Sequence, residues 1–562
     1  MRILFVYPNL YTQMGLSHGL ASISAVLKEA GHETRLVNLN ENLPPVPSSD
    51  EVVEQVRAWQ PGVIAFSCLT QQYVAGRELA QHLRSELGAD CPPLVVGGIH
   101  PTMVPTEVMG DAVWDHVGVG ECEEAMLELC ERIEAGERPD DVRNFLSWKG
   151  GARPDESAAL EPQWVHNPVR GFPSLAQMPA PDYELFDTGR ILEGKGGWFG
   201  IMTSRGCPYR CTYCLNHRLI DRYREDLSQR ASQIGFTRFR EPAHVIEEMR
   251  DVVERYPGVG TFILDDDLFT QDVPHALAFC EAYKESGIGL PFVVNAHVKQ
   301  LPEPVAAALA DSGCHILKLG IESGSPRVRA KVLRRPMSDE EMLETIARGE
   351  AYGLHTSGFV MVGLPTETRE ERWETVDFLA RSGLGRFRTS MFYPFPGTEG
   401  YELAWEGGWV REERMATLTD FTESSCLDFG EEENLFLEKL AAAMPWFVNA
   451  RMSLFREAPV SERYAPALEW LLSLSREQWE AEKDGLRARD AELSAAASAA
   501  GETHYAIRYN AAMGVRSDWF QAEDAGVEWL TAAAKPVPDA LGSDARRARA
   551  ARSLSAAAEE RA

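Results

Sequence analysis

Three cysteines lie close together in the segment SRGCPYRCTYC. Cys207, Cys211 and Cys214 follow one another at CxxxCxxC spacing, directly after a short strand-like stretch. Three thiolates can hold a four-iron cluster and leave its fourth iron open to an outside ligand, whereas a structural metal site is saturated by four protein ligands. The spacing therefore predicts an iron–sulfur cluster at which chemistry takes place.

A structural zinc site is the alternative interpretation of the same segment. Zinc requires a fourth protein ligand, and His217 follows Cys214 closely enough to supply one. A disulfide scaffold is not expected from the ten cysteines, because a long chain without a signal peptide is expected to remain in a reducing compartment.

The cysteine loop resembles that of radical S-adenosylmethionine (SAM) enzymes, in which an aromatic residue precedes the last cysteine. Further segments similar to those of the family occur in its order over residues 195–400: an acidic strand end, then GIESGS, then GFVMVGLPTET. The residues that this resemblance assigns to SAM binding are Tyr213, Asp265, Asp266, Asp267, Glu322, Ser323 and Gly363. It also implies that one electron from the cluster cleaves SAM to a 5′-deoxyadenosyl radical, so that no side chain need act as a nucleophile.

A repeated strand–helix pattern would position these residues. Segments 200–205, 261–267, 291–298, 315–323, 356–363 and 386–398 have strand character and alternate with helical segments. Such alternation predicts parallel strands, here a partial (β/α)6 barrel over residues 196–400. Functional residues of barrels gather where the strands end at their carboxyl termini, which is where the cysteine loop and the acidic triplet fall.

Residues 1–140 predict a separate α/β domain. Segments 3–8, 33–39, 62–68 and 93–100 are apolar on both faces and alternate with amphipathic helices, which is typical of a doubly wound, Rossmann-like parallel sheet. The third of these segments ends in Ser-Cys-Leu and the fourth in Gly-Gly, an arrangement similar to that of vitamin B12-binding domains fused to radical SAM barrels. The residues that this resemblance assigns to cobalamin are Tyr11, Ser67, Leu69, Gly97, Gly98, His100, Gly120 and Glu121.

The loop after the first strand departs from the pattern of B12 domains that supply a histidine to cobalt. Residues 9–15 read NLYTQMG and contain no histidine. The resemblance therefore implies cobalamin bound without a protein ligand on the lower face of cobalt. The alternative is a domain that has kept its fold and lost its ligand.

The rest of the chain carries less information. Residues 141–195 are rich in Pro, Gly and Asp and predict a linker, and residues 401–535 predict a helical C-terminal region. The tail at 536–562, rich in Ala, Ser and charged residues, is expected to be disordered.

Composition excludes several functions. The net charge of −29 would repel a nucleic-acid backbone, so we expect a small-molecule substrate and no nucleic acid. No stretch approaches the roughly 18 apolar residues of a membrane span, and the start MRILFVYPNL lacks the features of a secretory signal. We therefore expect a cytoplasmic protein.

The combined resemblance is to cobalamin-dependent (class B) radical SAM methyltransferases. It implies three cofactors, a [4Fe-4S] cluster, SAM and cobalamin, and a flavodoxin or ferredoxin as electron donor. The expected reaction is methyl transfer to an unactivated carbon of a small, natural-product-like molecule. One alternative keeps the cofactors but ends in cyclisation, rearrangement or oxidation, and another is a sensor that binds cofactors without turnover.

Overall fold

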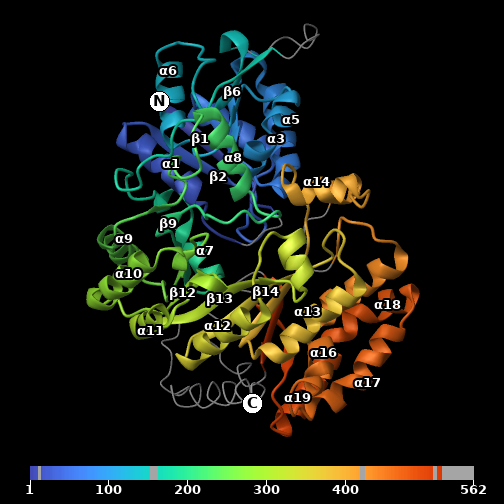
Figure 1. Ribbon diagram of the computed structural model, residues 1–562. Helices are drawn as coiled ribbons and strands as arrows, with labels where there is room; N and C mark the ends of the chain where they lie inside the picture. Colours follow the sequence, from blue (N-terminus) through green and yellow to red (C-terminus); the bar gives the residue numbers. More distant parts are fainter. Residues whose placement is uncertain (11–13, 152, 154–162, 418–423, 511–514, 522–562) are drawn as a thin grey trace. The chain divides into compact units, whose positions relative to one another are not determined.

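The computed structural model describes residues 1–10, 14–151, 153, 163–417, 424–510 and 515–521. The chain divides into two compact units (Figure 1). The first comprises Met1–Gly194, Tyr213–Arg238 and Phe395–Glu402, and the second comprises Lys195–Thr212, Phe239–Pro394 and the residues from Leu403 onward. The cysteine-rich segment therefore begins in the second unit and ends in the first.

A seven-stranded sheet forms the centre of the first unit. Its order is β2 (Glu33–Asn38), β1 (Arg2–Tyr7), β3 (Val63–Ser67), β4 (Leu94–Gly97), β5 (His116–Gly118), β6 (Phe145–Trp148) and β7 (Trp164–His166). Strands β1 to β5 are parallel, and β6 and β7 are antiparallel additions. The strand order reverses at β1 and β3, the place where open α/β sheets bind ligands.

Helices cover both faces of this sheet. They are α1 (His18–Glu29), α2 (Ser49–Trp59), α3 (Tyr73–Leu87), α4 (Ile99–Met103), α5 (Pro105–Gly110), α6 (Glu123–Glu134), α7 (Thr188–Gly194) and α8 (Asn216–Leu227). Along β1, Leu4 and Val6 join the core cluster shared with α2 and α3, whereas Ile3 and Phe5 join the cluster shared with α1 and α6. Burial on both faces explains the uninterrupted apolar strands and confirms the predicted doubly wound fold.

An eight-stranded sheet forms the second unit, and six of its strands are parallel. These are β8 (Trp198–Ile201), β11 (Thr261–Leu264), β12 (Phe292–Ala296), β13 (Cys314–Glu322), β14 (His355–Val362) and β15 (Arg386–Met391). The helices between them are α9 (Pro242–Arg255), α10 (Val273–Ser286), α11 (Glu303–Ser312), α12 (Asp339–Ala351) and α13 (Arg369–Ser382). This is the predicted partial (β/α)6 barrel (Figure 1).

The C-terminal region is helical, as predicted, but its last described residues form strands. Its helices are α14 (Glu399–Glu406), α15 (Glu412–Thr417), α16 (Glu431–Arg451), α17 (Val460–Ser473), α18 (Arg476–Glu482) and α19 (Leu486–Ala499). Strands β16 (Tyr505–Asn510) and β17 (Val515–Gln521) follow, and β17 pairs antiparallel with β15. This pairing occupies backbone groups that β15 would otherwise expose as an edge strand. The predicted tail, 536–562, lies outside the described residues.

Among the described residues, no helix combines the length and the apolar character that crossing a membrane requires.

Candidate functional site

The acidic residues that follow β11 hold the start of the cysteine loop. Asp266 is fully buried and accepts hydrogen bonds from the backbone N–H groups of Thr203 and Ser204, at 2.6 and 3.0 Å. The Thr203 hydroxyl donates to the other oxygen of the same carboxylate at 2.5 Å. Burial raises the pKa of Asp266 to about 6, against these hydrogen bonds, which lower it. The Asp266 side chain therefore fixes the backbone of Thr203 and Ser204, where the cysteine loop begins.

The two neighbouring acids differ from Asp266. Asp267 accepts a hydrogen bond from the Gly206 N–H at 3.1 Å, directly before the first cysteine. Gly206 has a φ of +89°, a conformation that other residues rarely adopt. Asp265 is exposed at the end of β11. Asp265 and Asp267 are therefore both accessible to a ligand, and the SAM contacts stay a prediction.

The thiol groups fit an iron–sulfur cluster by their chemistry. None of the ten cysteines forms a disulfide. Burial raises the pKa of Cys207 to about 11, so loss of its proton needs the positive charge of a metal. Arg335 donates a hydrogen bond to Cys211 Sγ at 3.7 Å. Cys214 and Tyr213 follow in the first unit, and both are half-buried.

His217, the fourth ligand of the zinc alternative, lies on α8 within the first unit. Its side chain is fully buried, and its Nε2 is 3.7 Å from a carboxylate oxygen of Glu399. Within the described ranges, no three His, Cys, Asp or Glu side chains stand together as a preformed metal site. The cluster assignment therefore rests on the loop spacing and on the thiol chemistry.

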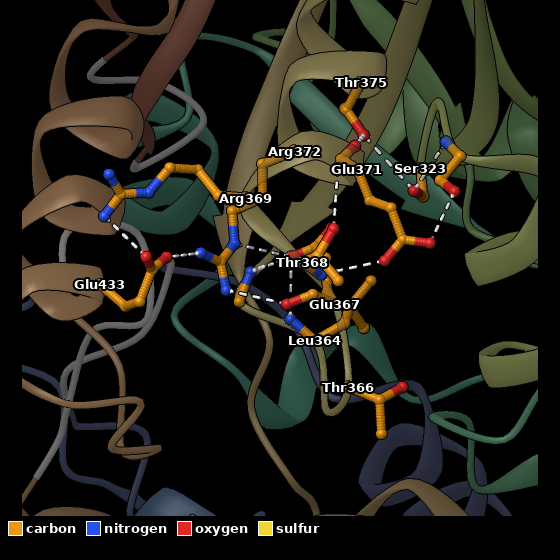
Figure 2. A network of polar contacts seen from close by, with 12 residues as sticks. Ser323, Leu364, Thr366, Glu367, Thr368, Arg369, Glu371, Arg372, Thr375 and Glu433 are labelled. Atoms are coloured by element: carbon orange, nitrogen blue, oxygen red, sulfur yellow. Dashed lines mark hydrogen bonds and ion pairs between the residues drawn. The ribbon is translucent and has the colours of Figure 1, made fainter.

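The remaining predicted SAM residues are Glu322, Ser323 and Gly363. They lie where β13 and β14 end, in loops that α13 holds in place (Figure 2). Ser323 follows β13; its side chain is fully buried, 3.4 Å from the Thr375 hydroxyl. Gly324 packs so closely on α13 that an added Cβ would lie 2.3 Å from the Glu374 carbonyl oxygen. Glu322, at the strand end, has a φ of +66°.

Glu371 of α13 joins these two loops. It accepts two hydrogen bonds from Arg327, at 2.6 and 2.7 Å, and one from the Ser325 hydroxyl at 3.1 Å. It also accepts from the N–H of Thr368, the residue that caps α13. A single carboxylate thus ties the loop after β13 to the start of α13.

A buried ion pair fixes the loop after β14. One carboxylate oxygen of Glu367 accepts from the N–H groups of Gly363 and Leu364, at 2.8 and 3.2 Å, and from Arg372 at 3.3 Å. Both side chains are almost completely buried, and Arg372 also contacts Glu433 of α16 (Figure 2). Burial raises the pKa of Glu367 to about 7, although Arg372 opposes the shift.

Sequence reasoning missed these supporting residues. The available signal was the capping pattern Thr368-x-x-Glu371, which marks where α13 begins. The pattern does not indicate that Glu371 also binds Arg327, or that Glu367 and Arg372 pair, because these contacts depend on how the loops fold back on the helix.

The predicted cobalamin residues of the first unit lie at the carboxyl ends of β3 and β4. Ser67 and Leu69 are partly exposed, and Gly97 and Gly98 are accessible. An added Cβ at Gly97 would meet no heavy atom within 4 Å, whereas one at Gly98 would lie 2.8 Å from the Cys68 backbone. Gly97 therefore faces open space, and Gly98 is required by chain packing.

Buried amides line the same end of the sheet. The Gln72 amide donates to Asn9 at 3.3 Å and accepts from the Leu69 N–H at 3.1 Å. Both amide side chains are almost completely buried just beyond β1 and β3. An accessible glycine beside polar groups at the strand-order reversal fits a large polar ligand such as cobalamin.

Three other predicted cobalamin residues make contacts within the protein. His100 packs on the ring of Tyr73 at 4.5 Å, and burial lowers the pKa of His100 to about 4, so it is neutral. The Gly120 backbone approaches the Tyr223 ring so closely that an added Cβ would lie 2.3 Å from the hydroxyl oxygen. Glu121 forms an ion pair with Arg238. Tyr11 lies outside the described residues.

Replacing Gly97 by leucine is expected to reduce cobalamin affinity without unfolding the domain. The leucine side chain would enter open space at the ligand-binding end of β4, so it would overlap with bound cobalamin and not with the protein. We expect the affinity for cobalamin to fall roughly tenfold, which corresponds to about 1.4 kcal/mol. Equilibrium dialysis with hydroxocobalamin measures it. Gly110→Leu is the control, since Gly110 is exposed on α5 and also has open space. Equal cobalamin affinities of the two variants would contradict a cobalamin site beside Gly97.

The fold and these loops define an iron–sulfur enzyme that carries a second, ligand-binding α/β domain. The radical SAM superfamily model matches residues 201–379, and the B12-binding domain model matches residues 13–130. The chain belongs to the radical SAM enzymes with a B12-binding domain. The two models imply the [4Fe-4S] cluster, SAM and cobalamin as its cofactors.

Known relatives and a solved structure are similar to this chain. An uncharacterised methyltransferase of Pyrococcus horikoshii is 25% identical, covering 72% of this chain and 83% of the relative. An anaerobic magnesium-protoporphyrin IX monomethyl ester cyclase of Rubrivivax gelatinosus is 24% identical over 77% of this chain and 75% of its own. The radical SAM methyltransferase TsrM of Kitasatospora setae, solved with cobalamin and a [4Fe-4S] cluster, has a TM-score of 0.55 at 18% identity, covering 73% of this chain and 76% of TsrM.

Proposed function

We propose that this enzyme transfers a methyl group from SAM to an unactivated carbon of a small molecule, by way of cobalamin. The observation that carries the proposal is the presence, in one chain, of a three-cysteine loop and a B12-binding domain. Similarity to proteins named methyltransferases supports it. When bound, the cofactors supply a 5′-deoxyadenosyl radical and a transferable methyl group.

The side chains of this protein position these reactants. Cys207, Cys211 and Cys214 would hold the cluster, and Asp266 keeps the start of their loop fixed through three hydrogen bonds. Asp265, Glu322 and Gly363 border the predicted SAM site. Radical chemistry of this kind would require no acidic hydrogen on the carbon to be methylated and no general base among the side chains. We further propose a flavodoxin or ferredoxin as the source of electrons.

Product analysis tests methyl transfer. Anaerobic protein with cluster, cobalamin and reductant is incubated with methyl-deuterated SAM and a small-molecule extract of its own cells. We expect 5′-deoxyadenosine and S-adenosylhomocysteine to form together, only with extract, and one extract component to gain a deuterated methyl group. The same assay without extract is the control.

A second candidate is cyclisation, rearrangement or oxidation, which similarity to a cyclase favours. It predicts extract-dependent 5′-deoxyadenosine without S-adenosylhomocysteine and without label in any product. A sensor that binds the cofactors without turnover predicts no 5′-deoxyadenosine under any condition. Either result would overturn the methyltransferase proposal.

A further inference from the structure

One face of the parallel sheet in the second unit has partly exposed positions on β12 to β15. Helix α12 covers the opposite face: an added Cβ at Gly349 would lie 2.9 Å from Thr356 and 3.2 Å from Leu317. Since successive side chains of a strand point to opposite faces, Lys318 and Ser357 face away from α12. We call this second face the inner face of the barrel.

Exposure alternates along the strands in the same sense. On β13, β14 and β15, every partly exposed position except His315 belongs to the inner face, although other residues of that face, including Ser357 and Arg386, are buried. The partly exposed positions of the inner face on these strands are Lys318, Gly320, Phe359, Met361, Arg388 and Ser390. A ligand can therefore reach the inner face.

A row of polar side chains crosses this face. Asn295, Lys318, Ser357 and Arg386 are register partners on four adjacent strands, so they share one face. The Arg386 guanidinium donates to the Ser357 hydroxyl at 2.8 Å, and this arginine is 1% exposed. Buried polar groups are costly in free energy unless they are hydrogen-bonded, and the Asn295 amide meets this need by donating to the Asp266 carbonyl oxygen at 2.8 Å. Lys318, between Asn295 and Ser357 in this row, is partly exposed and can reach a ligand.

Positive charge predominates among the groups that act most strongly on Lys318. Asp265 favours its charged form, whereas Arg386, Arg388 and Lys195 oppose it; together with burial, they lower the pKa of Lys318 to about 8. Lys195 lies shortly before β8, the strand at the far edge of the parallel sheet, and Arg388 lies over the Phe359 ring at 5.5 Å. Because Arg388 already packs on this ring, Lys318 is the more informative position to test.

We propose that the inner face binds the anionic group of the substrate, a carboxylate or a phosphate-type group, with Lys318 as its direct partner and Arg386 beside it. Cations with oriented N–H donors form strong, charge-assisted hydrogen bonds to such oxygens. A local excess of positive charge also explains how a protein with a net charge of −29 can attract an anion. The inference deepens the proposed function, because it names the substrate class of that site.

Anion binding is tested without SAM and without turnover, on the cluster-loaded, cobalamin-loaded enzyme. Calorimetric titration uses methylphosphonate, acetate and, at equal ionic strength, chloride. We expect methylphosphonate or acetate to bind the wild-type enzyme. The affinity of Lys318→Met for this probe should be lower by at least roughly tenfold, whereas the affinity of Lys318→Arg should be close to that of the wild type. The probe that binds more tightly identifies the group as phosphate-type or carboxylate. Lys284→Met is the matched control, since Lys284 is exposed on α10.

Two results would overturn the proposal. One is that neither probe binds the wild type beyond chloride; the other is that Lys318→Met binds as tightly as Lys284→Met. A third titration, with SAM, must give the same affinity in Lys318→Met and wild type, because a loss there would assign Lys318 to SAM instead. Failure of methyl transfer leaves these titrations unaffected, so the two proposals fail separately.

Discussion

The variant C207A/C211A/C214A is expected to contain no iron–sulfur cluster and to leave SAM uncleaved. Three thiolates are the ligands that hold a four-iron cluster with one open iron, and removing all three leaves this loop without thiolate donors. Wild-type protein reconstituted with iron and sulfide should hold about four irons per chain and absorb visible light. Iron analysis, the visible spectrum and 5′-deoxyadenosine formation with reductant measure the difference.

The matched control removes three other cysteines of the second unit. Cys280, Cys314 and Cys426 are buried, with exposed fractions of 3%, 4% and 0%, and belong to core packing. The variant C280A/C314A/C426A should therefore keep its iron and its SAM cleavage. If the first variant still holds about four irons, the cluster ligands lie elsewhere and the assignment is wrong.

Replacing Arg372 by methionine is expected to destabilise the second unit by about 3–5 kcal/mol, because it leaves a carboxylate buried without its cation. Glu367 would keep the hydrogen bonds from Gly363 and Leu364 but lose Arg372, and the contact to Glu433 of α16 would disappear. The loop after β14 should then loosen. Hydrogen exchange of the α13 amides measures this better than global unfolding, which is rarely two-state in a chain of this size.

The pH dependence of this variant has a definite sign. A buried acid whose folded pKa is raised stabilises the protein less as pH rises from its unfolded to its folded value. In the wild type, the loss of stability with rising pH ends near the Glu367 pKa of about 7. Without Arg372 the pKa of Glu367 is higher, so stability continues to fall above this pH. The deficit of Arg372→Met should therefore be larger at pH 8 than at pH 6.

Arg369→Met provides the control on the same helix. Arg369 pairs with Glu432 and Glu433, but its side chain is 33% exposed, so its loss should change stability by about 1 kcal/mol or less. Equal protection of the α13 amides in the two variants would show that the buried pair does not hold the loop (Figure 2).

Local sequence patterns determined the fold class, and they predict the cluster loop. Apolar strands alternating with amphipathic helices predict parallel sheets because crossover connections bury both faces, and both sheets have the predicted parallel strands. The spacing of Cys207, Cys211 and Cys214 is likewise written in consecutive residues. Such features need no knowledge of distant contacts.

Tertiary structure alone decided what each predicted residue contacts. Asp265, Asp266 and Asp267 are chemically identical in the sequence, yet Asp265 is exposed while Asp266 is buried against Thr203, some sixty positions earlier in the chain. Glu367 pairs with Arg372 in the buried loop after β14, and Lys318 and Arg386 share one face of the sheet only because of the register of three strands. The burial of a side chain and the register of a strand arise from contacts between segments that are distant in the sequence. Local sequence patterns do not indicate these contacts, because the environment of each side chain depends on which strand or helix packs against it.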